Sequence, residues 1–224
     1  MLTASDALSA TLATNRRMAS RLRRIDPVWR QPLADLAHFA PLATGATLRM
    51  VQLGTGSHRA ALATIAPQVA RVLDRHPDTS FTYFSARRVC DALETHPRAR
   101  RLDPMTWREY QRWMARHRFH LALYPLDQTR FDRARSANKI TEHAILGAVG
   151  LYPEGWRPAQ RLGDGAALFA PDDPEAWEEA IEAALAERPR LSHIAAEAAQ
   201  TLANADPTAA QQAVWSDILG LDLT

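Results

Sequence analysis

Segment 136–142, which reads Ser-Ala-Asn-Lys-Ile-Thr-Glu, has residues suited to binding a nucleoside diphosphate. We predict that Ser136 caps a helix, which places Asn138 and Lys139 in its first turn. A helix start attracts a diphosphate, and Lys139 adds a positive charge there. Glu142 shares a helix face with Lys139 and can accept hydrogen bonds from two ribose hydroxyls. The same spacing also suits an exposed intrahelical ion pair worth roughly a few tenths of a kcal/mol, and both interpretations stay open.

Lys139 is the only lysine in the sequence, in which every other member of the Lys and Arg set is arginine. If arginine has replaced lysine at every position where either residue suffices, a lysine remains only where a compact ammonium group is required. Chance can also leave one lysine behind, and both explanations stay open.

The second candidate element is the loop Gly54-Thr55-Gly56-Ser57-His58, which follows a predicted strand at 48–53. A strand, a glycine-rich turn and a helix can bring backbone N–H groups to a phosphate. His58 can hydrogen-bond a substrate from this loop, or it can be an ordinary histidine at a helix start. Arg87 follows the second predicted strand, so we include it in the candidate site.

A nicotinamide site, and with it an oxidoreductase, is disfavoured by the same loop. The dinucleotide fingerprint requires a third glycine and an acidic residue after the second strand. The third glycine is missing here, and the second strand ends in Phe-Ser-Ala-Arg.

The elements that would position these residues alternate along the chain. Predicted strands at 48–53, 79–84, 119–124, 149–152 and 166–169 alternate with helical segments. This order indicates an α/β fold, a Rossmann-like parallel sheet flanked by helices with right-handed crossovers. Ligands of such sheets bind at the carboxyl ends of strands near a topological switch point. The loops at 54–58, 85–88 and 124–139 are therefore the candidate edge.

The helices are predicted from caps and apolar stripes. We expect Pro67 in the first turn of the helix after His58, a cap at Thr106, and a helix from Ser136 to Ala148. Asp173 is expected to cap another helix. Two alanine-rich helices, at 191–204 and 208–219, are expected to end the chain. Four tryptophans fall at helix-core spacing and are interpreted as packing: Trp107, Trp113, Trp177 and Trp215.

Two domains are predicted, a proline-punctuated helical extension at 1–45 and a Rossmann-like domain with its C-terminal helices at 46–224. The net charge of +2 is a weak argument for a polyanion partner. We interpret the arginines at 16–24 as a solvated helix face and those at 98–101 as a basic loop, and expect no nucleic-acid partner.

No apolar run approaches the length of a membrane span, and no signal peptide is evident, so a cytoplasmic location is expected. The single cysteine, Cys90, excludes an intramolecular disulfide and is expected to be buried in a helical stretch. No pair of histidines has convincing zinc-ligand spacing, and no Gly-x-Ser-x-Gly elbow occurs.

Over roughly 48–220 the sequence resembles the C-terminal, nucleotide-sugar-binding domain of GT-B-fold retaining glycosyltransferases. This is the group of sucrose and glycogen synthases, and the likeness is greatest to bacterial group 1 (family 4) members of polysaccharide biosynthesis. Five features carry the resemblance in order: the Gly-Thr-x-x-His loop at 54–58, Arg-His-Pro at 75–77, Pro-Leu-x(4)-Phe at 125–131, Arg-Ser-x-x-Lys-x-x-Glu-His-Ala at 135–144, and Glu-x-Trp at 175–177.

The resemblance implies that Lys139 binds the donor diphosphate, that Glu142 binds the ribose, and that His58 and its glycine loop lie near the donor sugar. It implies a nucleoside-diphosphate sugar as substrate, with no cofactor and no obligatory metal. No catalytic residue is assigned. The family's other glutamate, eight residues before the ribose-binding one, is Ala134 here, and Ala61 replaces a frequent aspartate.

The sequence also has little that corresponds to the acceptor-side domain. The short segment 3–7 resembles that domain's last strand. A protein partner, or a domain outside this sequence, is therefore expected to supply the acceptor half. The alternative is a non-catalytic, degenerate glycosyltransferase-like binding or scaffold module.

Overall fold

The computed structural model describes residues 47–54, 56–127, 129, 132, 135, 137–163, 165–204 and 216. Several predictions of the sequence lie outside these residues. They are the extension at 1–45 with its segment 3–7, the site residues Thr55 and Ser136, Ala134, and the last helix at 208–219 with Trp215.

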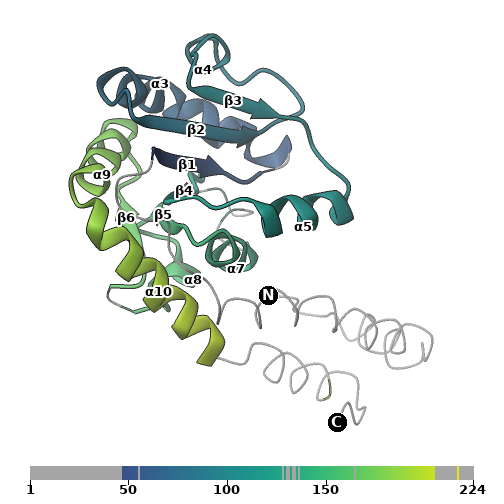
Figure 1. The fold of residues 1–224 in the computed structure, drawn as a ribbon, viewed down its shortest axis with the longest axis vertical. Helices are drawn as coiled ribbons and strands as arrows, with labels where there is room; N and C mark the ends of the chain where they lie inside the picture. The colour runs from purple at the N-terminus through teal and green to yellow at the C-terminus, as the bar shows by residue number, and fades with distance from the viewer. Residues whose placement is uncertain are drawn as a thin grey trace.

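The described residues form one parallel sheet of six strands, flanked by helices, as predicted (Figure 1). The strands run in the order β3-β2-β1-β4-β5-β6, and every neighbouring pair is parallel. Their bounds are β1 Leu48–Gln52, β2 Thr79–Phe84, β3 Ala99–Leu102, β4 Leu121–Leu123, β5 Val149–Pro153 and β6 Leu168–Ala170.

The helices of the described residues lie on both faces of this sheet. They are η1 Gly56–His58, α3 Arg59–Arg75, α4 Asp91–Glu94, α5 Trp107–Arg116, α7 Asn138–Ile145, α8 Arg157–Gln160, α9 Pro174–Ala186 and α10 Arg188–Asn204. The short α8 was not predicted from the sequence, whereas α4 lies in the helical stretch predicted around Cys90.

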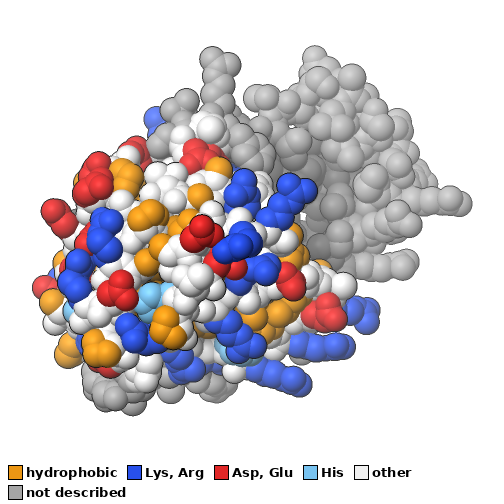
Figure 2. Space-filling view, turned by 90° about the horizontal axis from the view of Figure 1, so that it is seen from above, with side chains coloured by type: hydrophobic (Ala, Val, Ile, Leu, Met, Phe, Trp, Pro, Cys, Tyr) orange, Lys and Arg blue, Asp and Glu red, His pale blue; other side chains and the backbone are white. Residues whose placement is uncertain are grey.

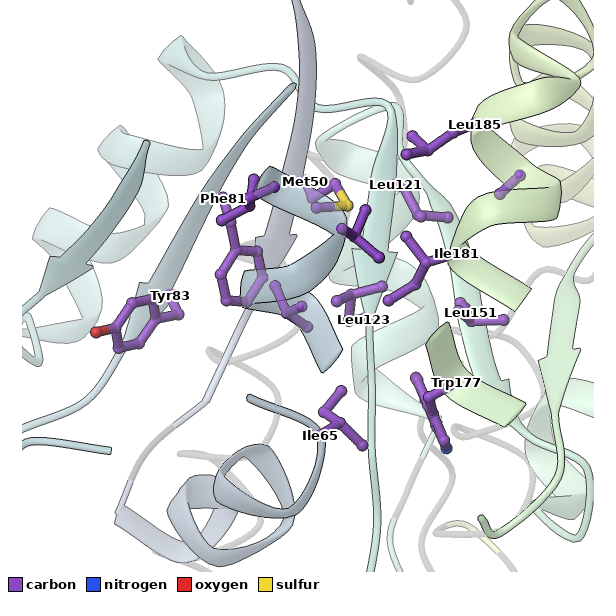
Figure 3. Close-up of a cluster of buried hydrophobic side chains, with 14 of the residues drawn as sticks. Met50, Ile65, Phe81, Tyr83, Leu121, Leu123, Leu151, Trp177, Ile181 and Leu185 are labelled. Carbon is purple, nitrogen blue, oxygen red and sulfur yellow. The ribbon is translucent and has the colours of Figure 1, made fainter. Parts of the chain in front are cut away.

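Alternation along β1 divides the core between the two faces. Met50 belongs to the larger cluster, under α3 and α9, where Trp177, Ile181 and Leu185 form an apolar stripe (Figure 3). Val51 belongs to the second cluster, under α5 and α7. The same sheet therefore fixes α3 on one face and α7 on the other.

Two predicted caps are confirmed. The Thr106 hydroxyl accepts the Glu109 N–H, and the Glu109 carboxylate accepts the Thr106 N–H at 2.9 Å, which completes a capping box at α5. The Asp173 carboxylate accepts the Ala176 N–H at 3.0 Å at the start of α9.

The predicted place of Pro67 is wrong, because Pro67 lies inside α3 rather than in its first turn. Its ring costs the helix a hydrogen bond, an effect of about 3 kcal/mol in an isolated helix. Leu62, Ile65 and Ala66 are buried around it. Burial of this face against the sheet outweighs the local cost.

The interpretation of 98–101 as a basic loop is also wrong, because Ala99–Leu102 forms the edge strand β3, paired with β2. Arg100 and Arg101 are exposed there, as suits charged residues at a sheet edge. Figure 2 shows basic and acidic side chains intermixed on the face it presents.

Three further local predictions need correction. Cys90 is the half-exposed N-cap residue of α4 rather than a buried helical residue. Trp107 is not core packing, since 42% of it is exposed. The helix predicted to run from a cap at Ser136 to Ala148 has Ala137 as its N-cap residue and ends at Ile145, because Gly147 takes a left-handed conformation with φ 65°.

Candidate functional site

The candidate site lies where the direction of the strand order reverses. β1 and β4 are neighbours in the sheet, yet the helices that follow them, α3 and α7, cover opposite faces. The loop after β1 contains Gly54 and His58, and the segment after β4 leads into Lys139 at the start of α7. Such a switch point is where parallel sheets bind ligands.

Gly54 is required by a close approach at the end of β1. A Cβ atom at Gly54 would lie 2.5 Å from Gln52 Nε2 and 2.8 Å from His58 Cβ. A Cβ at Gly56 would meet nothing within 4 Å. The two glycines that the sequence presents as one motif therefore differ, since only Gly54 is needed to fold the loop back on itself.

His58 is buried and lies against Arg135. The Arg135 guanidinium Nη1 donates to His58 Nε2 at 3.0 Å, and Nη2 donates to the Ser57 carbonyl at 3.3 Å. Arginine can only donate, so Nε2 accepts and the ring proton is on Nδ1. His58 Nδ1 is buried and has no partner among the residues that the structure describes. Its N–H therefore has no acceptor in the described part of the chain.

Arg135 is itself held by Asp132. Its Nε donates to Asp132 Oδ1 at 2.6 Å, and the Thr129 hydroxyl donates to Asp132 Oδ2 at 2.7 Å. Burial raises the pKa of Asp132, but bonds from Arg135 and Thr129 outweigh it and hold that pKa below its usual value. Sequence reasoning gave Arg135 no role, and only its place in the family-like motif at 135–144 could have drawn attention to it.

The pair predicted at α7 is formed. Lys139 Nζ lies 2.5 Å from Glu142 Oε2, and both side chains are largely buried, with 17% and 7% exposed. The pair is therefore not on an exposed helix face. The Tyr110 hydroxyl, from α5, donates to the same Glu142 oxygen at 2.8 Å. Nothing in the sequence indicated that Tyr110 would reach this pair, because 32 positions separate it from Glu142.

A buried aromatic cluster lies beside this network. His143 Nδ1 is 2.9 Å from the Tyr152 hydroxyl, and the Tyr124 ring lies 5.4 Å from His58 and 6.1 Å from His143. A Cβ at Gly150 would overlap the Tyr152 ring, so this position must be glycine. His143 Nε2 and Trp156 Nε1 are buried without a partner in the described part of the chain.

Burial, together with the positive charges of the site, keeps its histidines neutral. Burial, and then the positive charges of Arg135 and Lys139, lower the pKa of His58 to about 4, against the opposite effect of Asp132. Burial, Lys139 and His58 lower the pKa of His143 to about 3. The loop after β1 and the start of α7 therefore belong to one electrostatic network.

This network predicts an acid-sensitive fold. The pKa of His58 and His143 is lower in the folded chain than the usual 6.5, so the unfolded chain binds protons first. The free energy of unfolding should be level above pH 7 and fall from pH 6.5 toward pH 4, by about 1.4 kcal/mol per pH unit for each buried histidine. Urea unfolding at pH 7, 6 and 5 measures it.

The His143→Asn variant serves as the control, since its slope against pH should be smaller than that of the parent. Equal stability at pH 7 and pH 5 would contradict the prediction.

The other predicted site residues that the structure describes are exposed, in contrast to the largely buried network of His58, Arg135, Lys139 and Glu142. Asn138 is exposed at the start of α7, and Gly56 and Ser57 are exposed in η1. Arg87 is exposed in the loop after β2, where its backbone bonds the Ser85 hydroxyl. Within the described residues, no hydrogen bond or ion pair joins the Arg87 side chain to His58, Lys139 or Glu142.

Two further features are absent from the described residues. No group of three or more His, Cys, Asp or Glu side chains there is arranged to hold a metal ion. In the same part of the chain, none of the helices has the length and apolar character needed to cross a membrane.

The sheet order and the switch-point site define a class of fold: the chain has the fold of the C-terminal domain of GT-B glycosyltransferases. The C-terminal domain of LpcC from Francisella tularensis, a glycosyl transferase group 1 family protein, is 10% identical with a TM-score of 0.55. The match covers 78% of this chain and 90% of that one.

Two longer solved structures are also similar. WaaG, a glycosyltransferase involved in lipopolysaccharide biosynthesis, is 14% identical with a TM-score of 0.60, over 87% of this chain and 51% of its own. Anabaena HepE, in complex with UDP and glucose, is 13% identical with a TM-score of 0.59, over 85% and 52%. The chain thus spans about half the length of each. By sequence, it matches no family model and no curated protein.

Proposed function

We propose that this chain binds a nucleoside-diphosphate sugar at the switch point and acts as the donor half of a retaining glycosyltransferase. The observation that carries the proposal is the single network of His58, Arg135, Lys139 and Glu142, which joins the loop after β1 to the start of α7. The similarity to HepE, whose structure holds UDP and glucose, supports the same choice of ligand.

Each group has a role suited to its position. Lys139 and the N–H groups at the start of α7 would take the charge of the diphosphate, so no obligatory metal is proposed. Glu142 would accept the ribose hydroxyls. The free Nδ1–H of His58 would donate to the sugar or to a phosphate oxygen. A partner or a further domain would bring the acceptor, to which the sugar passes as its bond to the diphosphate breaks. A cytoplasmic location and a place in polysaccharide biosynthesis belong to the same proposal.

A non-catalytic module is the second candidate, and one observation favours it. The charged groups of the site already satisfy one another: Arg135 pairs with Asp132, and Lys139 pairs with Glu142. A site with its charges paired is stable without a ligand, so the fold can persist after binding has been lost.

Calorimetric titration of the purified chain with UDP, GDP and their common sugar conjugates distinguishes the two. We expect one nucleotide to bind, and its sugar conjugate to bind at the same site. A folded chain that binds none of these compounds would exclude the donor-site proposal and leave the scaffold module.

A further inference from the structure

Tyr110, on the helix α5 that follows β3, forms a hydrogen bond with Glu142, the residue proposed to bind a ribose. Its hydroxyl donates to Glu142 Oε2 at 2.8 Å across 32 positions of sequence. Burial, and then the charge of Glu142, raise the pKa of Tyr110 well above its usual range, so the hydroxyl remains a donor. The donor-site proposal gives this contact no role.

The position of the Tyr110 ring is set by packing rather than by Glu142. Phe84 meets the Tyr110 ring edge-on at 5.6 Å, and the Trp113 ring lies parallel to it at 6.4 Å. The capping box at Thr106 fixes the first turn of α5, which Tyr110 follows directly. The Tyr110 hydroxyl therefore stays in place as a donor, whichever other groups bind the Glu142 carboxylate.

Lys139 is the less permanent partner of the same oxygen. Its ammonium bonds Glu142 Oε2, but a diphosphate at the start of α7 would compete for that ammonium. Once Lys139 turns to the diphosphate, Tyr110 is the remaining donor that the structure shows on Glu142. The last torsion of a glutamate is broad, so a carboxylate without that donor is free to turn.

We propose, on the basis of the donor site proposed above, that Tyr110 is a positioning residue. It holds the Glu142 carboxylate in an orientation in which the 2′-hydroxyl of a ribose donates to one carboxylate oxygen and the 3′-hydroxyl donates to the other. The site therefore prefers ribonucleotides to 2′-deoxyribonucleotides. When Lys139 leaves Oε2, it frees one acceptor position there, so the ribose need not displace Tyr110.

The test compares UDP with 2′-deoxy-UDP, and GDP with 2′-deoxy-GDP, by calorimetry of the full chain. We expect the parent to bind the ribonucleotide of the recognised base about tenfold more tightly than its deoxy form. In Tyr110→Phe the preference should fall to about twofold or less, because the ribonucleotide loses two positioned contacts with Glu142 and the deoxy form loses only that of its 3′-hydroxyl. A general structural defect would weaken both ligands together and leave their ratio unchanged.

Tyr83→Phe is the matched control, because the Tyr83 hydroxyl donates to Glu94 at 3.0 Å in the same kind of bond, away from Glu142. It should keep the tenfold ratio. In a Glu142→Gln background, Tyr110→Phe should produce no further change in the ratio. Thermal unfolding of each variant shows that it is folded.

Two results would overturn the role of Tyr110 while the donor site stands. One is a parent that binds UDP or GDP without preferring ribose, and the other is Tyr110→Phe with the full preference. Tighter binding of the ribonucleotide by Tyr110→Phe would also overturn it, because the hydroxyl would then compete with the ribose. If a folded parent binds no nucleotide of either pair, the donor site itself fails and the role of Tyr110 fails with it.

Discussion

Lys139→Met is expected to lower the affinity for the recognised nucleoside diphosphate by about 100-fold, or ~3 kcal/mol. The ammonium is the one lysine charge of the chain and lies at the start of α7, in the network that lowers the pKa of His58. A diphosphate placed there loses a charge-assisted hydrogen bond when the ammonium is removed. Calorimetric titration of parent and variant measures the loss.

The same substitution is expected to reduce stability, since it leaves the carboxylate of Glu142 buried without its cation, at a cost of about 3 kcal/mol. The double variant Lys139→Met with Glu142→Gln removes both charges, so it should recover most of the stability but none of the binding. Arg112→Met, which removes an exposed positive charge from α5, controls for net charge and should bind as the parent does. Binding at parental strength by a folded Lys139→Met chain would contradict the role of the lysine.

Gly54→Ala is expected to lower the free energy of unfolding by about 2 kcal/mol and the affinity for the nucleotide at least about tenfold. The new Cβ would lie 2.8 Å from His58 Cβ, an atom that cannot move unless the backbone of η1 moves with it. That movement carries His58 away from Arg135, whose Nη1 now lies 3.0 Å from the ring. Urea unfolding and calorimetry report the two effects separately.

Gly56→Ala is the matched control for stability, because a Cβ there meets nothing within 4 Å. Its unfolding midpoint should stay close to that of the parent. If Gly54→Ala unfolds at the same urea concentration as Gly56→Ala and binds normally, then the close approach at Gly54 has no part in shaping the site.

Much of the fold could be predicted because its signals are local. Apolar runs bounded by turns predict five of the six strands, and a short polar residue before an apolar stripe predicts the caps at Thr106 and Asp173. The edge strand β3 was missed, since two of its four residues are exposed arginines and its apolar pattern is weak. Pro67 was misplaced because packing of α3 on the sheet overrides a local preference.

The contacts of the candidate site are likewise of two kinds, local ones that the sequence predicts and long-range ones that it does not. Lys139 and Glu142 are one helical turn apart, so their contact follows from the sequence once the helix is predicted. The contact of Arg135 with His58 spans 77 positions, and that of Tyr110 with Glu142 spans 32. No periodicity in the sequence joins such positions.

The sequence alone therefore determined the kinds of element, their order, and the residue types available at the end of each strand, because these depend on neighbours along the chain. The tertiary structure decided which of those residues meet. The order β3-β2-β1-β4-β5-β6 brings the ends of β1 and β4 together, and α5 and α7 share one face, which brings Tyr110 to Glu142. The fold also buries the Lys139–Glu142 ion pair. The interaction between two charges is stronger where the fold excludes water, so the strength of this pair depends on the tertiary structure.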